Sequence, residues 1–551
     1  MPEQISGEKL FEEFKTVQLS EFFRKNRQYL GYVGKIKSLT TVIHELLSNS
    51  LDACEESKIV PSIKITITEM GTEHYKVRVE DNGPGIPEKH LEKVFGQLLT
   101  GTKFHRNIQL RGQQGLGVSG CVLFSQMTSG KPTYVKSGTG KGKVVEAMVE
   151  LDIKTNSPKL IDKTVENSTM RGTVVESEFK GVQYTKGMRG PFEYVRWTAA
   201  ANPHAEIMFK DPEGNEMLFE RVIDKVPKVP KEIKPHPSGL EAHDILDMAL
   251  KSKSRAISSF LTTDLARVSS EKVREIQSRV DFDLAKSPKR LEWPEAEQIV
   301  KSFKKIKFMA PPTDGLIPIG KDQIEKALNN LLSPDFIEVI SRKPTTYKGG
   351  IPFIVEIAIA YGGNSGRATS SKEVHERKVE IMRFANRSPL LFDAGGCALT
   401  KAVNSIEWRR YKLKDMENSP VSLFINLIST HVPYTSAGKQ AVAGEEEILN
   451  EIRMALMRAS RSLQRFLSGR RKAAEIAERK KMYERYIPET AKALAKLTGG
   501  KEDELEKKLK ILVLERFGDD EPDENDEAEE DLEEEGAAYD EIPEDVSEEG
   551  E

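Results

Sequence analysis

The chain has 551 residues, of which 38% are hydrophobic and 31% are charged, and its formal net charge is -4. At about 100 to 200 residues per domain, this length predicts three or four domains. No run approaches the about 18 apolar residues of a membrane span, and the charged start lacks a signal-peptide core, so we expect a cytoplasmic protein. The three cysteines are scattered, which excludes a disulfide framework and a zinc-finger spacing.

The charge is unevenly distributed. Residues 519–551 contain 20 Asp and Glu and no Lys or Arg, which leaves 83 basic against 67 acidic residues, a formal charge of +16, in the rest of the chain. We expect the acidic tail to be disordered. The basic remainder suits a polyanion such as nucleic acid, and an ordinary solvated surface is the alternative.

Alternating apolar residues predict strands at 63–67 and 75–79, and 40–56 has the pattern of an amphipathic helix. The first 228 residues are therefore predicted to be α+β. A proline-rich linker at 226–237 precedes a region, 240–306, with helical periodicity and several basic residues. This region is predicted to be a small helical insert.

Strands are predicted again at 351–361, 378–384 and 421–428, with helix-like segments between them, which indicates βαβ units with right-handed crossovers. Apolar residues at steps of three or four predict a helix over about 444–484, roughly 60 Å long, with Gly469 as a candidate interruption. Eleven Arg and Lys against three Glu between 453 and 485 make it a basic rod. The predicted domains are 1–228, 229–307, 308–485, 486–518 and 519–551.

Three polar residues of the first helix, Glu45, Asn49 and Asp52, are spaced i, i+4, i+7 and share one face. Two carboxylates and an amide suit a hard cation and a water-activating base. A solvated polar face is the alternative.

A carboxylate, Asp81, stands where the second strand ends and is followed by Gly83 and Gly85. An acceptor there can bind an exocyclic amine, since the glycines let a flat base approach the backbone. An ordinary hairpin turn is the alternative.

Six glycines lie between Gly96 and Gly120, and the last of them lead into an apolar run. Glycines before a helix free backbone N–H groups to surround phosphate oxygens. No Gly-Lys-Ser/Thr closes the segment, so it is not a Walker A loop, and a flexible surface loop is the alternative.

The order Glu-x3-Asn-x2-Asp, Asp-x-Gly-x-Gly, Gly-x2-Gly-x-Gly and finally Gly172-Thr173 resembles the Bergerat ATP-binding fold of the GHKL superfamily, an α/β sandwich. The resemblance implies that Glu45 activates water, Asn49 binds Mg²⁺ and Asp81 binds the adenine amine. The residues implied to bind ATP are Asn49, Asp52, Asp81, Gly83, Gly85, Thr102, Lys103, Gly112, Gln113, Gln114, Gly115, Leu116, Gly117, Val118, Ser119, Gly120, Thr173 and Lys439.

The C-terminal half, with its motifs at 386–393 and 432–439, resembles the transducer of the topoisomerase VI B-subunit family. The insert at 229–307 resembles that family's helix-two-turn-helix domain, and the likeness covers about residues 10–490. It implies that Lys439 is the switch lysine that reaches the γ-phosphate and acts with Glu45 in catalysis. The acidic tail lies outside the likeness.

The resemblance implies an ATP-hydrolysing subunit of a type IIB topoisomerase that relaxes and decatenates double-stranded DNA in the nucleoid. ATP binding would dimerise the chain, with a strap before Ile36 crossing to the other protomer. The sequence lacks a gyrase-type acidic metal signature and a context for a DNA-attacking tyrosine. Cleavage is therefore expected on a separate A subunit, in an A2B2 heterotetramer.

Two other functions stay open at this point. A GHKL chaperone-like protein clamp is favoured by the acidic tail and the shared ATP fold, and DNA-stimulated ATP hydrolysis would separate it from a topoisomerase. The other open function is a nucleotide-gated DNA-binding module that does not turn over ATP. A histidine kinase is disfavoured, because no histidine precedes the ATP motifs on a dimerising helical hairpin.

Overall fold

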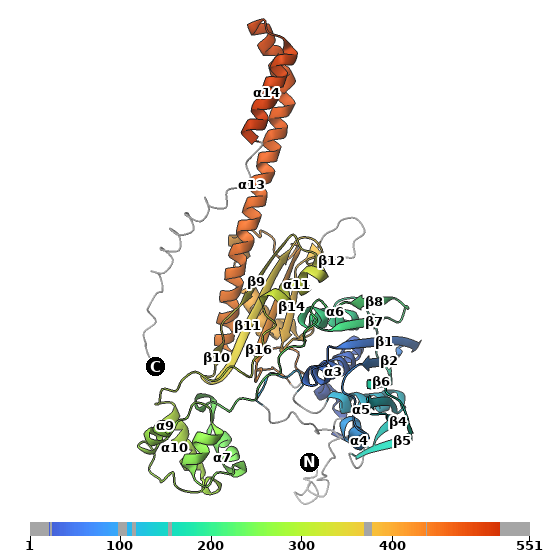
Figure 1. The fold of residues 1–551 in the computed structure, drawn as a ribbon, viewed down its shortest axis with the longest axis vertical. Coiled ribbons are helices and arrows are strands. Elements are labelled where there is room, and N and C mark those ends of the chain that lie inside the picture. Colours follow the sequence, from blue (N-terminus) through green and yellow to red (C-terminus); the bar gives the residue numbers. More distant parts are fainter. Residues whose placement is uncertain are drawn as a thin grey trace, which may run out of the picture. The chain divides into compact units, whose positions relative to one another are not determined.

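The computed structural model describes residues 21–22, 25–96, 107–112, 117–152, 157–368, 377–436 and 438–517. The chain forms two compact units, Met1–Ser460 and Arg461–Glu551, and each is described by itself (Figure 1). Within the described ranges, no helix has the length and apolar character that crossing a membrane requires.

The N-terminal domain is an eight-stranded sheet covered by helices, with the strand order β5-β4-β3-β6-β2-β1-β7-β8. Neighbouring strands are antiparallel except for β1 and β7, which are parallel. The strands are β1 (Ser62–Gly71), β2 (His74–Asp81), β3 (Thr133–Thr139), β4 (Val144–Asp152), β5 (Ser157–Glu166), β6 (Arg171–Lys180), β7 (Glu206–Lys210) and β8 (Glu216–Phe219). The helices are η1 (Arg27–Leu30), α3 (Lys35–Glu56), α4 (Glu88–Gly96), α5 (Gly117–Ser129) and α6 (Pro191–Ala201).

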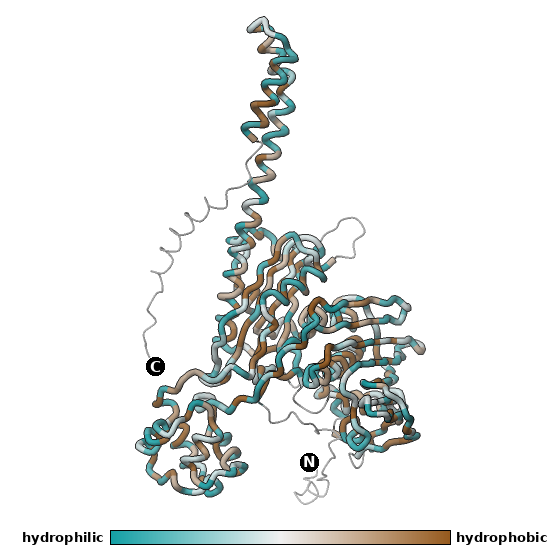
Figure 2. Tube along the Cα trace, viewed as in Figure 1, coloured by the Kyte–Doolittle hydropathy of each residue, from teal (hydrophilic) through white to brown (hydrophobic). Residues whose placement is uncertain are grey.

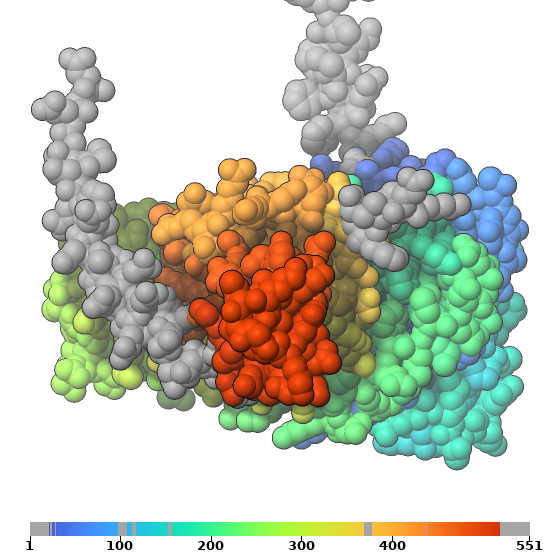
Figure 3. Space-filling model, turned by 90° about the horizontal axis from the view of Figure 1, so that it is seen from above, coloured from blue at the N-terminus to red at the C-terminus, as the bar shows by residue number. Residues whose placement is uncertain are grey.

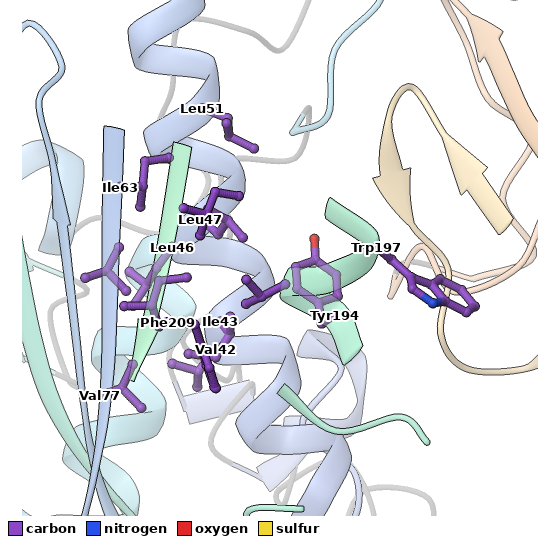
Figure 4. Close-up of a cluster of buried hydrophobic side chains, with 14 of the residues drawn as sticks. Val42, Ile43, Leu46, Leu47, Leu51, Ile63, Val77, Tyr194, Trp197 and Phe209 are labelled. Atoms are coloured by element: carbon purple, nitrogen blue, oxygen red, sulfur yellow. The ribbon is translucent and has the colours of Figure 1, made fainter. Parts of the chain in front are cut away.

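The helix α3 positions the candidate site because one face of it is anchored in the core. Its apolar side chains Ile43, Leu47 and Leu51 are at most 1% exposed and lie in the same core cluster as Ile63 and Phe209 of the sheet (Figure 4). Burying each such side chain contributes about 1.5 to 3 kcal/mol. The helix predicted over 40–56 is confirmed and begins earlier, at residue 35.

The region after the proline-rich linker is helical, as predicted. It contains η2 (Pro237–Gly239), α7 (Ala242–Lys251), α8 (Ile257–Asp264), α9 (Ser270–Gln277), η3 (Pro288–Arg290) and α10 (Trp293–Phe303). These helices enclose a core of their own, which includes Ile245, Phe260, Ile276, Ile299 and Phe303. The insert thus has a small hydrophobic core of its own within the first unit.

The second sheet has the order β10-β11-β16-β14-β15, with β9 also paired to β11. Its elements are α11 (Lys321–Leu332), β9 (Phe336–Ser341), β10 (Thr345–Tyr347), β11 (Ile351–Tyr361), β14 (Glu380–Ala385), β15 (Ser388–Pro389), η4 (Ala394–Gly396), α12 (Ala398–Asn404), η5 (Trp408–Tyr411) and β16 (Val421–Ser429), and β12 (Arg367–Ala368) pairs with β13 (Arg377–Lys378) beside it.

Hydrophobic residues, brown in Figure 2, fill the central strands of this sheet. The strands β14 and β16 are parallel and α12 lies between them in sequence, so the predicted βαβ unit is present. By contrast, β11 pairs antiparallel with β16 over nine residues, so the βαβ arrangement does not extend to this pair. The handedness of the crossover stays a prediction.

The long helix α13 (Glu446–Thr498) has 53 residues and runs through Gly469 without a break. The expected interruption at Gly469 and the end near residue 484 are therefore wrong. A glycine costs a helix only about 1 kcal/mol, and the following residues are mostly strong helix formers such as Ala, Lys, Arg and Glu. The shorter helix α14 (Glu502–Phe517) follows, its Phe517 ring 5.4 Å from Tyr483, and the red atoms of these helices lie together in Figure 3.

Candidate nucleotide site

The predicted catalytic carboxylate, Glu45, and the predicted metal ligand, Asn49, lie together on the open side of α3. The side chain of Glu45 is 29% exposed, and Asn49 is exposed. The amide nitrogen of Asn49 donates to the Glu45 carbonyl oxygen at 2.5 Å, which directs its amide oxygen away from the helix. The structure therefore brings together the two groups that the motif predicts.

The first residue of α5, Gly117, closes onto this pair. A Cβ atom at Gly117 would lie 2.2 Å from Oε2 of Glu45 and 3.5 Å from Nδ2 of Asn49. A larger residue at this position would require the Glu45 carboxylate to move away from the first turn of α5. A helix N-terminus favours anions, so this corner is electrostatically suited to a carboxylate and to phosphate oxygens.

The carboxylate of Asp81 is fixed at the end of β2 by three donors. Its Oδ1 accepts from the backbone N–H groups of Gly83 at 2.9 Å and Thr173 at 3.2 Å, and its Oδ2 accepts from the Ser50 hydroxyl at 3.0 Å. Burial raises the pKa of Asp81, whereas these donors act to lower it. Since a carboxylate oxygen has two lone pairs, Oδ2 keeps one for a ligand amine.

Two glycines around Asp81 allow backbones to touch. Gly85 has φ +71°, and a Cβ there would lie 2.0 Å from the Gly138 carbonyl oxygen. Gly172 has φ +118°, and a Cβ there would lie 1.9 Å from the Asp81 carbonyl oxygen. The corner predicted from Asp-x-Gly-x-Gly and Gly172-Thr173 thus exists as one closely packed junction of β2, β3 and β6.

Part of the predicted phosphate loop falls outside the described residues. This applies to Thr102, Lys103, Gln113, Gln114, Gly115 and Leu116, and also to most of the strap and to the acidic tail. Gly112 ends the described segment before the gap, while Val118, Ser119 and Gly120 lie in the first turn of α5. The loop therefore leads into a helix N-terminus, as predicted.

Asp52 differs from the expectation that it faces the ligand pocket with Asn49. It is only 6% exposed, and its Oδ1 accepts from Nη1 of Arg111 at 2.7 Å. Asp52 shares a side of α3 with Glu45, but it lies two turns further along, where Arg111 covers it. Asp52 thus forms a buried ion pair in this structure, and its role in ligand binding stays a prediction.

Arg111 is a buried residue beside the candidate site that the sequence did not single out. Its guanidinium contacts Asp52, both oxygens of Glu55, and the Asn202 side chain at 2.5 Å. Burial acts to raise the pKa of Glu55, but Arg111 and a hydrogen bond with His204 hold it below its usual value. A lone arginine directly before a predicted glycine loop was the available signal.

Residues 107–111 lead into the glycine loop. They are hydrogen-bonded to the domain that contains the second sheet, which we call the second domain. The Gln109 N–H donates to the Gly315 carbonyl at 3.0 Å, and the Gln109 side-chain oxygen accepts from the Ile317 N–H at 2.7 Å. The Asn386 amide, from the motif at 386–393, donates to the Leu110 carbonyl at 3.0 Å. This segment joins the two sheets.

Lys439, the predicted switch lysine, continues this junction. It lies on a loop after β16 with φ +52°, and its Nζ donates to the Arg111 carbonyl oxygen at 3.1 Å. Its charge also acts to lower the pKa of His44, the neighbour of Glu45. The lysine thus comes from the second domain to the base of the glycine loop.

Among the described residues, no group of three or more His, Cys, Asp and Glu could hold a metal ion alone. Mg²⁺ in nucleotide sites commonly takes one or two protein oxygens and completes its shell with phosphates and water, and the role of Asn49 as such a ligand stays a prediction.

Comparisons with known proteins place two parts of the chain in known families. Residues 34–153 match the family of histidine kinase-, DNA gyrase B- and HSP90-like ATPases, and residues 311–480 match the topoisomerase VI B subunit transducer. Among solved structures, the ATPase region of Saccharomyces cerevisiae topoisomerase II covers 83% of this chain and 98% of its own, at 11% identity and a TM-score of 0.40.

Two curated relatives match over nearly their whole length. The B subunit of type 2 DNA topoisomerase 6 from Methanothermobacter thermautotrophicus is 50% identical over 92% of this chain and 96% of its own. The protein of the same name from Pyrococcus furiosus is 44% identical over 92% of this chain and 95% of its own length. The chain therefore belongs to the topoisomerase VI B-subunit family, with a GHKL-type ATPase domain and a transducer domain.

Proposed function

We propose that the chain hydrolyses ATP at the site between α3 and α5, as the motor subunit of a topoisomerase that passes one DNA duplex through another. This proposal rests on the arrangement of four residues. Glu45, Asn49 and Gly117 lie together, and Lys439 contacts the Arg111 carbonyl at the base of the glycine loop. Glu45 takes the proton of the attacking water, and Asp81 binds the adenine amine.

Asn49 fits a Mg²⁺ ion through its side-chain oxygen, and the ion would neutralise the charge of the phosphates. Asn49→Ala should weaken nucleotide binding in the presence of Mg²⁺ and leave binding in EDTA unchanged. Titration of a fluorescent ATP analogue in both buffers measures this. Equal affinity of the variant and the parent chain in Mg²⁺ would count against the assignment.

Lys439 would exchange its bond with the Arg111 carbonyl for the γ-phosphate when ATP binds. The Arg111 carbonyl would then be bonded to Lys439 only when ATP is absent. Because segment 107–111 is also bonded to the transducer, the transducer would have two arrangements that depend on the nucleotide. In this proposal ATP binding also dimerises the chain and closes a gate around DNA. The basic side of α13 would hold DNA through phosphates, independent of sequence.

The relatives are named as B subunits, so we propose an A subunit that cuts DNA in an A2B2 assembly. The second unit offers exposed apolar groups for such a contact, since Met482, Tyr483 and Tyr486 are 44% to 62% exposed on α13. On α14, Ile511, Leu512 and Leu514 are 53% to 59% exposed. Apolar groups of this size at a surface indicate a protein partner.

The test incubates supercoiled DNA with ATP, Mg²⁺ and this chain, with and without the A subunit. We expect relaxation and protein-linked breaks only when both subunits are present, and DNA-stimulated ATP turnover. Truncation after Ser468 should keep nucleotide binding and abolish association with the A subunit. Breaks from this chain alone would contradict the two-subunit proposal, and turnover without DNA stimulation would favour a protein clamp.

A further inference from the structure

A partly buried histidine, His44, stands directly beside the proposed general base. Its Nδ1 lies 2.5 Å from the hydroxyl oxygen of Tyr194, and the two rings meet edge to face with centroids 5.3 Å apart. Its other nitrogen, Nε2, lies 3.8 Å from Oε1 of Glu45. The imidazole thus bridges the phenol of Tyr194 on α6 and the carboxylate of Glu45 on α3.

The protons along this bridge can be assigned from its chemistry. Burial raises the pKa of Tyr194 to about 12, so the phenol keeps its proton and can donate it. Burial also lowers the pKa of His44, so the imidazole is neutral and has one nitrogen without a proton. When the phenol donates to Nδ1, the proton of the neutral ring is on Nε2, which faces Glu45.

We propose that His44 is a positioning residue for Glu45 and that Tyr194 fixes its tautomer. The proposal rests on the proposed role of Glu45 as the base. The His44 Nε2–H group, moving closer than 3.8 Å when the site closes, would hold Oε1 and leave Oε2, beside Gly117, to take the proton of the attacking water.

The surroundings of His44 carry charges that act on it in both directions. Glu45 and Asp52 favour the protonated ring, whereas Lys439 disfavours it. The effect of Lys439 couples His44 to the transducer. If Lys439 moves away from Arg111, the electrostatic potential at the His44 ring changes. Burial lowers the pKa of His44 by more than the two carboxylates raise it, so the neutral form of the ring is favoured.

Tyr194→Phe tests the tautomer with little change of shape, because the ring stays packed between α3 and the neighbouring Trp197 (Figure 4). We expect kcat to fall about tenfold, the value of one lost hydrogen bond, with KM and ATP affinity unchanged. The control is Tyr347→Phe, which removes a buried phenol donor to the His431 carbonyl in the transducer. It should lower the melting temperature without lowering kcat.

His44→Gln and His44→Leu test the bridge itself. The Gln amide nitrogen can replace Nε2–H, so His44→Gln should retain more turnover than His44→Leu. Tyr194→Phe should add no further loss in the His44→Leu background, since both changes remove one chain of bonds. A purely structural role predicts equal turnover in the two His44 variants and additive losses, which would overturn the proposal.

Glu45→Gln separates the role of the base from the role of the histidine. If this variant keeps normal turnover, Glu45 is not the base and His44 has no base to position. If Glu45→Gln abolishes turnover but Tyr194→Phe and His44→Leu both retain full kcat, only the positioning role of His44 is refuted. If His44→Leu does not fold, the kcat of Tyr194→Phe alone decides.

Discussion

The two ends of the nucleotide site are built differently. The corner around Asp81, where we propose that adenine binds, is closed by donors from one domain, with the Gly83 and Thr173 N–H groups and the Ser50 hydroxyl all within 3.2 Å. The catalytic end joins α3, α5 and a lysine from the second domain. In the proposed mechanism, one domain recognises the base by itself, whereas hydrolysis depends on how two domains meet. Binding and turnover should consequently be separable by mutation.

The largest expected effect is at the catalytic end. Glu45→Gln keeps the size of the side chain and removes the base, so kcat should fall by about 10² to 10⁴, the usual value of a general base. ATP affinity should stay within about twofold of the parent chain, as measured by equilibrium titration beside a phosphate-release assay. Turnover near the normal rate would remove Glu45 from the mechanism.

Gly117→Ala should be next in size. The added Cβ would lie 2.2 Å from Oε2 of Glu45 and must displace the carboxylate, and a misplacement of about 1 Å can cost about 10² in rate. Gly395→Ala is the matched control, since a Cβ there meets nothing within 4 Å. Steady-state kinetics of both variants measure the difference, and equal kcat values would show that the carboxylate can move freely.

Asp81→Asn tests the adenine corner. The amide lacks the charge that strengthens a bond to the ligand amine, so ATP and ADP should both bind about tenfold more weakly. At saturating ATP, kcat should change little, because Asp81 lies away from the reacting phosphate. A fall in kcat with unchanged affinity would contradict the separation of the two ends.

The smallest effect concerns the acidic tail. Deleting residues 519–551 removes 20 acidic groups that would compete with DNA for the basic surface. DNA should then bind a few-fold more tightly at low salt, with the difference disappearing as the Debye length falls from about 30 Å at 0.01 M to about 8 Å at 0.15 M. Fluorescence anisotropy across a salt series measures it, and equal affinity at low salt would leave the tail a different role.

The sequence predicts where the local residues of the candidate site lie, whereas their roles stay predictions. Glu45 and Asn49 share a helix face because a helical period fixes their direction, and Asp81 meets Thr173 because adjacent strands pair in register. The insert and the two sheets also follow from apolar periodicity. Lys439 was predicted only through resemblance, since nothing local links it to a segment 328 residues earlier.

The parts that the sequence did not predict depend on long-range partners. Periodicity puts Asp52 on the side of Asn49, but it does not reveal that Arg111 covers it. His44 lies on no recognisable motif, and its role depends on Tyr194, 150 residues away. The length of α13 was underestimated, because the helix continues through Pro488 to Thr498.

The most direct test of the claim that two domains complete the site is the affinity of Lys439→Ala for ATP and for ADP. The account predicts that ADP affinity stays within about twofold, because only ATP has the γ-phosphate. ATP affinity should fall about tenfold or more, the value of a hydrogen bond between charged groups, with hydrolysis and ATP-driven dimerisation lost. Equal weakening of both nucleotides, or of neither, would contradict the account.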